Sequence, residues 1–145
     1  MDLKIEKGDI ETAWRVSCQV PELEDPHPPA EYRNRMREKT SLVLIAYVDG
    51  ACAGFKVGYD KFGDGSFYSW MGGVVPQFRN LHVAKALAMH QEQWARENGY
   101  RRIVFKTRNK HKAMLHFALS NGFSIVDVEP REMLADYRIL LCKDL

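Results

Sequence analysis

The sequence is poor in cysteine and has no long hydrophobic run. Its 145 residues include only three cysteines, Cys18, Cys52 and Cys142. They are too few and too widely spaced for a disulfide framework, so we expect reduced thiols in a cytoplasmic protein. No window reaches the roughly 18 consecutive apolar residues of a membrane-spanning helix. Residues 1–7 alternate apolar and charged side chains, unlike a signal peptide, and we expect no membrane partner.

Strong charge of one sign is also absent. The formal net charge is +2, which is too small to indicate a nucleic-acid or anionic-membrane partner by itself. The five histidines have no metal-ligand spacing, so we predict no metal site. The basic run at residues 101–112 leaves a nucleic-acid surface open as an alternative. We prefer the interpretation that these charges face water or a bound phosphate, and we expect no nucleic-acid partner.

A chain of this length is sufficient for one domain with its own core, and we expect a single domain at residues 1–145. Apolar alternation, glycine and proline predict seven strands, at residues 3–7, 41–48, 51–60, 66–75, 102–106, 123–128 and 137–142. Helical periodicity predicts four helices, at residues 11–20, 30–39, 81–98 and 110–121. Hairpins come first and strand–helix–strand crossovers follow, so the fold class is α/β (α+β) with a mixed sheet.

The junction between the strand at residues 66–75 and the following helix is the most informative stretch. The helix start carries Arg79, His82 and Lys85, although unpaired N–H groups there favour negative charge. This arrangement is reasonable if an external anion binds at the helix N-terminus. Gly72 and Gly73 interrupt the strand just before its end, which predicts that it parts from its neighbour and exposes backbone groups.

Three motifs in this region and beyond it resemble those of the GNAT superfamily of N-acetyltransferases. Residues 74–79, Val-Val-Pro-Gln-Phe-Arg, resemble its strand end V-x-P-x-x-R. Residues 79–84, Arg-Asn-Leu-His-Val-Ala, resemble its pyrophosphate loop [QR]-x-x-G-x-[GA]. Thr107-Arg108-Asn109, followed by Ala113 and by Gly122-Phe123, resembles its conserved asparagine and its Gly-Phe helix end. The order of elements matches along essentially the whole chain.

The resemblance implies a mostly antiparallel sheet of six to seven strands, about four helices and a splayed central strand. It implies acetyl-CoA as cofactor and transfer of its acetyl group to a primary amine of a small molecule or peptide, by direct attack of the amine. The residues that it assigns to coenzyme A, through the pantetheine amides, the pyrophosphate or the opposite wall, are Val74, Val75, Arg79, Asn80, Leu81, His82, Val83, Ala84, Lys85 and Asn109.

Two positions depart from the family pattern. His82 stands where relatives have the first loop glycine, and it either faces solvent or places an imidazolium beside the phosphate. Ala118 stands where many relatives have a tyrosine that protonates the leaving thiolate. Solvent can supply that proton, because protonating a thiol of pKa about 8.5 at pH 7 is worth only about 2 kcal/mol. These departures support an alternative function, a catalytically silent acyl-CoA-binding sensor.

Tyr68 is the candidate catalytic residue, because it lies on the strand where some relatives carry a glutamate base. A lysine-like amine must lose a proton at a cost of about 4.6 kcal/mol at pH 7, so a base or a water chain would help. Tyr68 is a poor base but can act as an acid, hold water or contact the acceptor. The alternative is that Tyr68 packs in the sheet. His116 is another candidate, but it lies two positions from Ala118 and so points elsewhere on the helix, and the alternative is a surface or packed histidine.

The acceptor site is less defined. In this fold its walls are the loop between the first two helices, with Glu22, Glu24, Asp25 and His27, and the loop between the last two strands, with Glu129, Glu132 and Asp136. These carboxylates would attract a cationic amine. Arg33, Arg35 and Arg37 favour an acceptor carboxylate instead, and both interpretations stay open. The final strand either caps the sheet or pairs across a homodimer.

Overall fold

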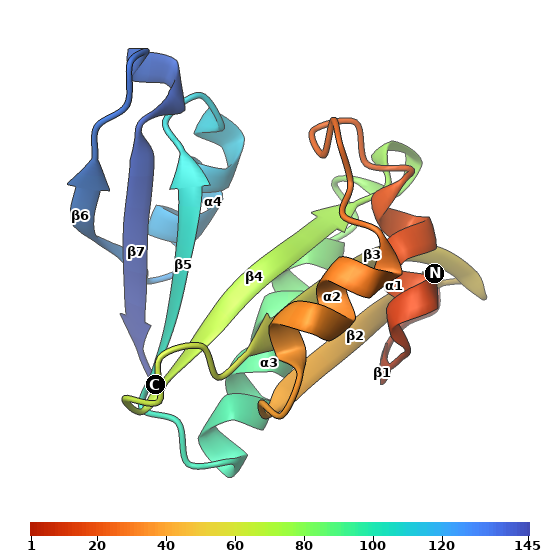
Figure 1. Ribbon diagram of the computed structural model, residues 1–145. Coiled ribbons are helices and arrows are strands. Elements are labelled where there is room, and N and C mark those ends of the chain that lie inside the picture. The colour runs from red at the N-terminus through yellow and green to blue at the C-terminus, as the bar shows by residue number, and fades with distance from the viewer.

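The computed structural model describes residues 1–145 and contains one seven-stranded sheet (Figure 1). The strands lie in the order β1-β2-β3-β4-β5-β7-β6. All neighbours are antiparallel except β4 and β5, which are parallel. The strands are β1 Leu3–Lys7, β2 Ser41–Val48, β3 Ala51–Tyr59, β4 Ser66–Val74, β5 Arg102–Arg108, β6 Ser124–Glu129 and β7 Arg138–Asp144. The predicted mixed, mostly antiparallel sheet is confirmed.

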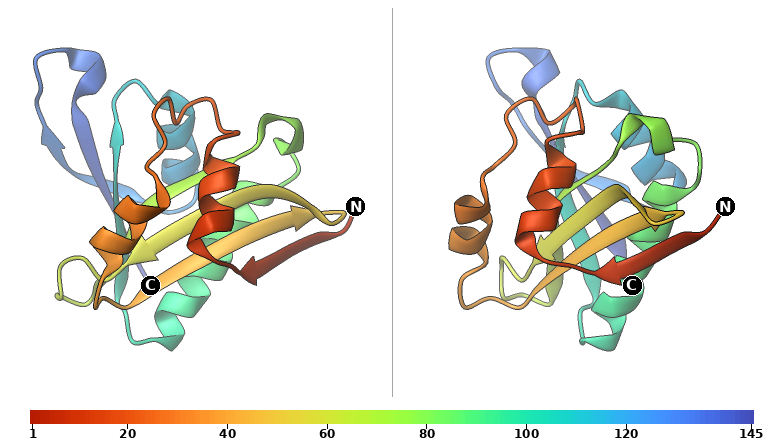
Figure 2. Two further views of the ribbon diagram at one scale, coloured as in Figure 1. Left: turned by 45° about the vertical axis from the view of Figure 1, so that its right-hand side comes forward. Right: turned by 90° about the vertical axis from the view of Figure 1, so that its right-hand side faces the viewer.

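Four helices cover the two faces of the sheet (Figure 2). They are α1 Ile10–Ser17, α2 Pro29–Met36, α3 Val83–Glu97 and α4 Lys112–Ser120. Helices α1 and α2 pack on the same face of β2–β4, where Ala13 and Tyr32 join a core with Phe55 and Val57. Helix α3 packs on the opposite face of these strands, and α4 packs against β5 and β7.

Local sequence explains most of these elements. Asp49 and Gly50 have φ values of 49° and 84°, which is the left-handed pair that a tight hairpin between β2 and β3 requires. Helix α1 begins at an ordinary cap, because the side chain of Asp9 accepts a hydrogen bond of 2.8 Å from the N–H of Thr12. Helix α3 has no such cap and no acidic residue in its first turn.

The buried stripe of α3 differs from the apolar pattern of its sequence. Helical spacing predicts one buried stripe through Val83, Leu87, His90 and Trp94. Val83 and Leu87 are buried, whereas His90 is exposed and Trp94 is half-buried. The buried positions of α3 are instead Val83, Leu87, Gln91, Glu92 and Ala95. The helix thus brings two polar side chains into the interior, and sequence periodicity, which counts only apolar residues, cannot anticipate that.

The three cysteines are free thiols. None of the helices is both long enough and apolar enough to cross a lipid bilayer.

Candidate active site

The sheet opens between β4 and β5. These strands pair only at Ser66–Tyr68 and Arg102–Val104, three residue pairs in all, and then diverge (Figure 1). Beyond this junction β4 keeps its other neighbour, since the N–H of Val75 donates to the carbonyl oxygen of Ala53 at 2.8 Å. Backbone groups alternate sides along a strand, so those of Val74 and Gly72 point to the open edge. The predicted splayed strand is present.

A β-bulge lies just beyond the junction. Gly58 of β3 is opposite Ser69, whereas Val57 is opposite Met71, so Trp70 is the extra residue. A bulge of this kind re-aims side chains at the end of a paired segment. Tyr68 and Trp70 both lie on the α1–α2 side, and the Trp70 ring packs against Tyr32 with ring centroids 4.9 Å apart.

The turn between β4 and α3 is built to bind an anion. Asn80 and His82 both have φ of 64°, and left-handed residues alternating with others turn successive N–H groups toward one point. The six consecutive N–H groups of residues 80–85 donate to no acceptor in the protein. Three of them belong to the first turn of α3, where the helix dipole also favours negative charge. His82, which stands at the first glycine position of the family motif, is thus left-handed, a conformation that histidine tolerates poorly.

These N–H groups surround a pocket of about 440 Å³. Its lining residues are Val74, Arg79, Asn80, His82, Val83, Ala84, Lys85 and Phe117. Seven of the ten residues assigned to coenzyme A from the sequence line this one pocket. Phe117, on α4, had not been predicted, because the sequence motifs do not reveal which face of α4 approaches the turn.

Three assigned residues are not in the pocket lining. Val75 is buried and its N–H is already bonded to β3. Leu81 is half-buried against the α3-side core, although its N–H is one of the six. The amide group of Asn109 donates to the carbonyl oxygen of Leu134 at 3.3 Å and accepts from Lys112 at 2.9 Å. Their contacts with a cofactor stay predictions.

Arg79 lines the pocket but is already held by two partners. Its Nε donates to the carbonyl oxygen of Val74 at 3.1 Å, and Nη2 binds the carboxylate of Glu22 at 2.6 Å. The hydrogen bond from Arg79 lowers the pKa of Glu22 below its ordinary value. Arg79 therefore ties the loop between α1 and α2 to the turn before α3.

Tyr68 lies at the closed end of the opening and is mostly buried, with an exposed fraction of 7%. Its ring makes edge contacts with Tyr59 and Phe62, at centroid distances of 5.7 and 5.9 Å. Burial, together with nearby Tyr59, raises the pKa of Tyr68. The hydroxyl group is therefore protonated at neutral pH, and can donate a hydrogen bond rather than accept a proton.

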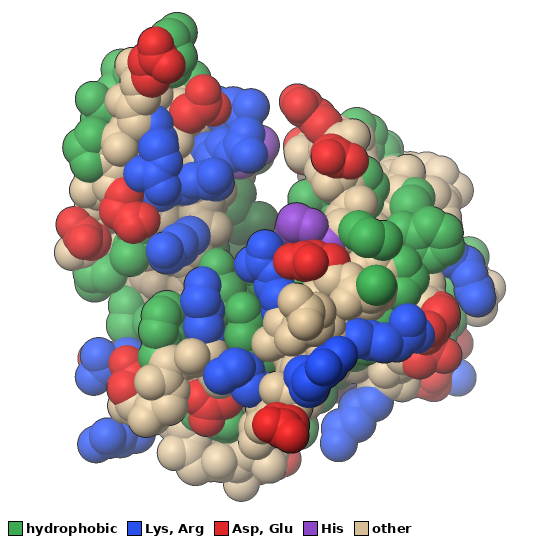
Figure 3. Space-filling view, in the orientation of Figure 1, with side chains coloured by type: hydrophobic (Ala, Val, Ile, Leu, Met, Phe, Trp, Pro, Cys, Tyr) green, Lys and Arg blue, Asp and Glu red, His purple; other side chains and the backbone are tan.

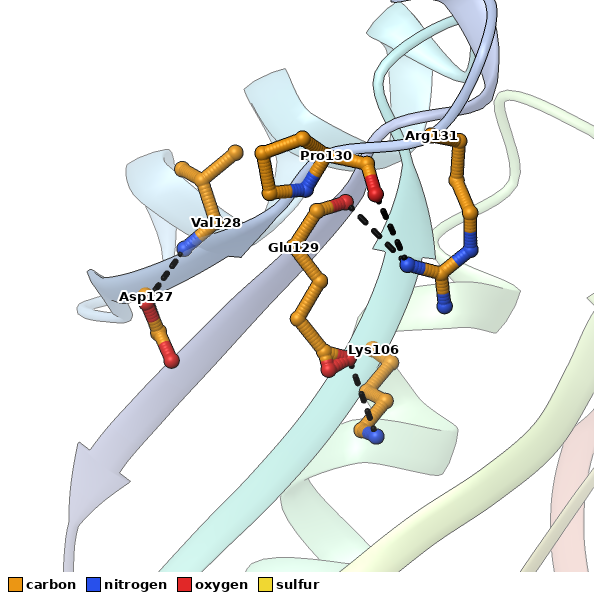
Figure 4. Close-up of polar contacts among 6 residues, drawn as sticks. All are labelled: Lys106, Asp127, Val128, Glu129, Pro130 and Arg131. Carbon is orange, nitrogen blue, oxygen red and sulfur yellow. Dashed lines mark hydrogen bonds and ion pairs between the residues drawn. The ribbon is translucent and has the colours of Figure 1, made fainter.

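The charges of Arg35 and Arg138 act on Tyr68, and Lys61, beside its ring, has Lys106 as a neighbour. We call these four cations the Tyr68 cluster. Lys61 Nζ lies 4.7 Å from the Tyr68 ring centroid. Arg35 is paired with Glu31, and Lys106 contacts Glu129 at 3.4 Å (Figure 4). Lys61 and Arg138 have no carboxylate within ion-pair distance. Figure 3 shows lysine and arginine side chains along the β5–β7 side of the hollow between the two halves of the sheet, at the left of the view.

Half of the carboxylates of the predicted acidic wall form ion pairs. Glu22 is bonded to Arg79 and Glu129 to Lys106. Asp136 lies 3.9 Å from both Arg108 and Lys110. His27 packs on the Trp70 ring, with centroids 5.4 Å apart. Three of the six carboxylates of these loops thus join ion pairs, whereas Glu24, Asp25 and Glu132 form none. The carboxylate nearest Tyr68, Glu129, is one of the paired ones, so the uncompensated charge beside Tyr68 is positive.

Helix α4 offers no acid at the position of the missing tyrosine. Ala118 has an exposed fraction of 1% and packs against Ile139 and Leu141. His116 is exposed, as expected for a surface histidine.

Strand β3, the neighbour of β4 away from the opening, carries one lysine, Lys56, in a largely buried run. Burial lowers the pKa of Lys56 to about 8. Sequence reasoning missed Lys56, although one charge in the run Ala-Gly-Phe-Lys-Val-Gly-Tyr is a visible signal.

The family model for the acetyltransferase (GNAT) family matches residues 9–123, well over half of the chain. The chain belongs to the GNAT family of acetyltransferases. No curated protein matched the sequence, but solved structures match the fold. The ribosomal-protein-S18-alanine N-acetyltransferase from Escherichia coli superimposes with a TM-score of 0.83 and 14% identity, covering 99% of this chain and 94% of that chain.

Two further structures support the same GNAT fold. Ard1 from Thermoplasma volcanium gives a TM-score of 0.82 with 18% identity, covering 100% of this chain and 99% of that one. The PaiA N-acetyltransferase from Thermoplasma acidophilum, crystallised in complex with coenzyme A, gives 0.80 with 15% identity over 100% of both chains. At these identities the likeness establishes the fold alone.

Proposed function

We propose that this GNAT protein transfers the acetyl group of acetyl-CoA to a primary amine. The observation that carries the proposal is the row of six unsatisfied N–H groups at residues 80–85, next to the open edge of β4. The row suits the pyrophosphate of coenzyme A, and the backbone groups of Val74 and Gly72 suit the two amides of its pantetheine arm. The arm then lies along β4 as an added strand.

The chemistry of transfer needs the amine to reach the thioester carbonyl as the free base. The acceptor approaches from the α1–α2 side, where Trp70 and Tyr68 line the inner end of the opening. Tyr68 supplies a hydroxyl donor that orients a water molecule or the acceptor. None of the carboxylates close to Tyr68 is unpaired, so the amine loses its proton to water, at a cost of about 4.6 kcal/mol for a lysine-like amine.

The Tyr68 cluster favours an acceptor that carries a carboxylate near its amine, such as an amino acid. Lys61 and Arg138 are the cations without an acidic partner, and both face Tyr68. A dicationic polyamine would be repelled by the same charges. A carboxylate also retains its charge when bound to such cations, because charge-assisted hydrogen bonds are about twice as strong as neutral ones.

The test measures thiol release from acetyl-CoA with a matched panel of acceptors. Free amino acids, their methyl esters and amides, and aliphatic diamines are compared at one pH, and acetyl-CoA binding is measured by calorimetry. We expect binding, and turnover that is fastest with free amino acids. Binding without amine-dependent thiol release would favour the silent acyl-CoA sensor instead. Faster turnover with diamines or esters would reject the carboxylate acceptor but retain the transferase.

A further inference from the structure

Lys56 is a half-buried cation next to the opening of the sheet. It lies on β3 between Gly54 and Gly58, and residues two apart along a strand share one face. The Gly54 position approaches Val83 of α3, and the Gly58 position approaches Gln91. The side chain of Lys56 therefore points to the α3 side, opposite to Tyr68 and Trp70.

The position opposite Lys56 on β4 is Gly72, at the open edge. A Cβ at Gly72 would lie 3.6 Å from Cγ of Lys56, so the lysine stem passes over a residue that has no side chain. Gly72 lies four residues beyond Tyr68, the last β4 residue paired with β5.

The surroundings leave the Lys56 ammonium group without a bonded partner. Glu92 of α3 is the carboxylate that faces it. That carboxylate is already bound by Lys143 of β7 at 2.8 Å, and Arg96 lies 4.0 Å away. No hydrogen bond or ion pair fixes Lys56 itself. Burial outweighs the attraction of Glu92 and lowers the pKa of Lys56 to about 8, which is close to the roughly 8.5 of a thiol.

We propose that Lys56 is the acid that protonates the sulfur of coenzyme A when the acetyl group leaves. The inference rests on the proposed function, because it takes the thioester to lie at the inner end of the opening. The amine nitrogen forms the new C–N bond, and the electron pair of the C–S bond passes to sulfur. Sulfur then takes a proton from Nζ of Lys56. The neutral lysine regains a proton through water from the nitrogen that attacked.

This role fits what the chain lacks elsewhere. Ala118 has no hydroxyl group to offer from α4, and it is buried against Ile139 and Leu141. Proton transfer is efficient when the pKa of the acid is close to that of the group it protonates and to the working pH. Glu92 attracts the lysine by charge, and Gln91, whose Nε2 is buried without a partner, is the other polar group on that side.

The test compares Lys56→Met and Lys56→Arg with wild type in kcat from pH 6.5 to 9.5. We expect wild-type kcat to fall above about pH 8 as Lys56 loses its proton. Both variants should lose about 10- to 30-fold in kcat, because protonating the thiol at pH 7 is worth about 2 kcal/mol, and should also lose this falling limb. Acetyl-CoA affinity should change less than threefold. Lys7→Met, an exposed lysine on β1, is the matched control and should behave as wild type.

Different results separate the two proposals. If wild type neither binds acetyl-CoA nor releases thiol, the proposed function fails. If wild type is active and the Lys56 variants keep the wild-type kcat and falling limb, only the role of Lys56 is rejected. Should Lys56→Met be unfolded by circular dichroism, the folded Lys56→Arg variant decides. Mass spectrometry that finds an acetyl group on Lys56 during turnover would make it a nucleophile and overturn the assignment.

Discussion

The guanidinium of Arg79 binds the carbonyl oxygen of Val74 and the carboxylate of Glu22 at the same time. One side chain thereby joins the end of the open strand to the loop between α1 and α2. The proposed phosphate site and the proposed acceptor wall share this residue. An arginine that already has a carboxylate partner is less available to a phosphate, so Glu22 competes with the cofactor.

Replacing Glu22 with Gln should tighten acetyl-CoA binding. The pair is partly exposed, and exposed ion pairs are worth about 0.2–1 kcal/mol, so we expect a gain of up to about fivefold in affinity at low salt. Calorimetry with coenzyme A measures it. Glu24→Gln is the control, since Glu24 forms no ion pair with Arg79. Weaker binding of the Glu22 variant would mean that the carboxylate positions Arg79 for the phosphate rather than competing for it.

Acidification should have the same effect as that substitution. The bond from Arg79 lowers the pKa of Glu22, so the carboxylate stays charged until the pH falls below its usual titration range. Protonation then releases Arg79. We expect the advantage of Glu22→Gln over wild type to be full at pH 7 and to shrink as the pH falls through the lowered pKa. An advantage that stays constant with pH would show that charge on Glu22 is not its source.

His82 should carry backbone strain that can be measured apart from its side chain. The left-handed conformation costs a non-glycine residue about 1–2 kcal/mol. Glycine removes this strain, but about 0.5–1 kcal/mol of the gain is lost because glycine gives the unfolded chain more conformational entropy. His82→Gly should thus raise the free energy of unfolding by about 0.5–1 kcal/mol, whereas His82→Ala should leave it nearly unchanged. Urea denaturation measures both. An equal free energy of unfolding for the two variants would show that His82 carries no backbone strain.

The same two variants decide what the imidazole group does. If it contacts the pyrophosphate, both variants should bind coenzyme A more weakly than wild type, and the loss should be larger at low pH, where imidazolium is favoured. If His82 faces solvent, His82→Gly should bind at least as well as wild type. A dissociation constant measured at pH 6 and pH 8 distinguishes the two interpretations.

Lys56 should make stability depend on pH. Its folded pKa of about 8 lies below the ordinary value of 10.5, so the folded state holds its proton less tightly than the unfolded state. Below pH 8 this costs roughly 3 kcal/mol, and the cost disappears as the pH rises from 8 to 10.5. Lys56→Met should therefore stabilise the protein at pH 7 and gain much less at pH 9.5. Chemical denaturation at both values checks this, and an equal gain would contradict it.

Lys61 should govern the preference for acidic acceptors. Lys61→Met removes a cation without a carboxylate partner beside Tyr68, so KM for a free amino acid should rise about three- to tenfold. KM for the methyl ester should change little. Lys4→Met, on β1 and exposed, is the control. A similar rise for acid and ester would assign Lys61 to packing rather than to charge recognition.

Much of the fold was predictable because its signals are local. The boundaries of β1 and β2 follow from alternation and from the turn residues around them, and Asp49-Gly50 specifies its own hairpin. The turn at residues 79–85 was predictable too, because missing acids and clustered bases at a helix start are a local electrostatic anomaly.

What could not be predicted depends on contacts between distant segments. The bulge at Trp70 exists because β3 and β4 meet in one particular register, and it lies two residues before the first glycine of β4. Gly73 turns out to have a packing reason, since a Cβ there would lie 2.9 Å from Val20. The neutralised carboxylates Glu22 and Glu129 look free in the sequence, because their partners lie 57 and 23 residues away.

The short junction between β4 and β5 separates the sheet into two parts. Three residue pairs connect the strands β1–β4 to the strands β5–β7 across the sheet. Amide hydrogen exchange should therefore divide the sheet into two cooperative units of different opening free energy, with the border at Tyr68 and Val104. A ligand that fills the gap as an additional strand would merge the two units into one, and bound protein should then unfold in a single step.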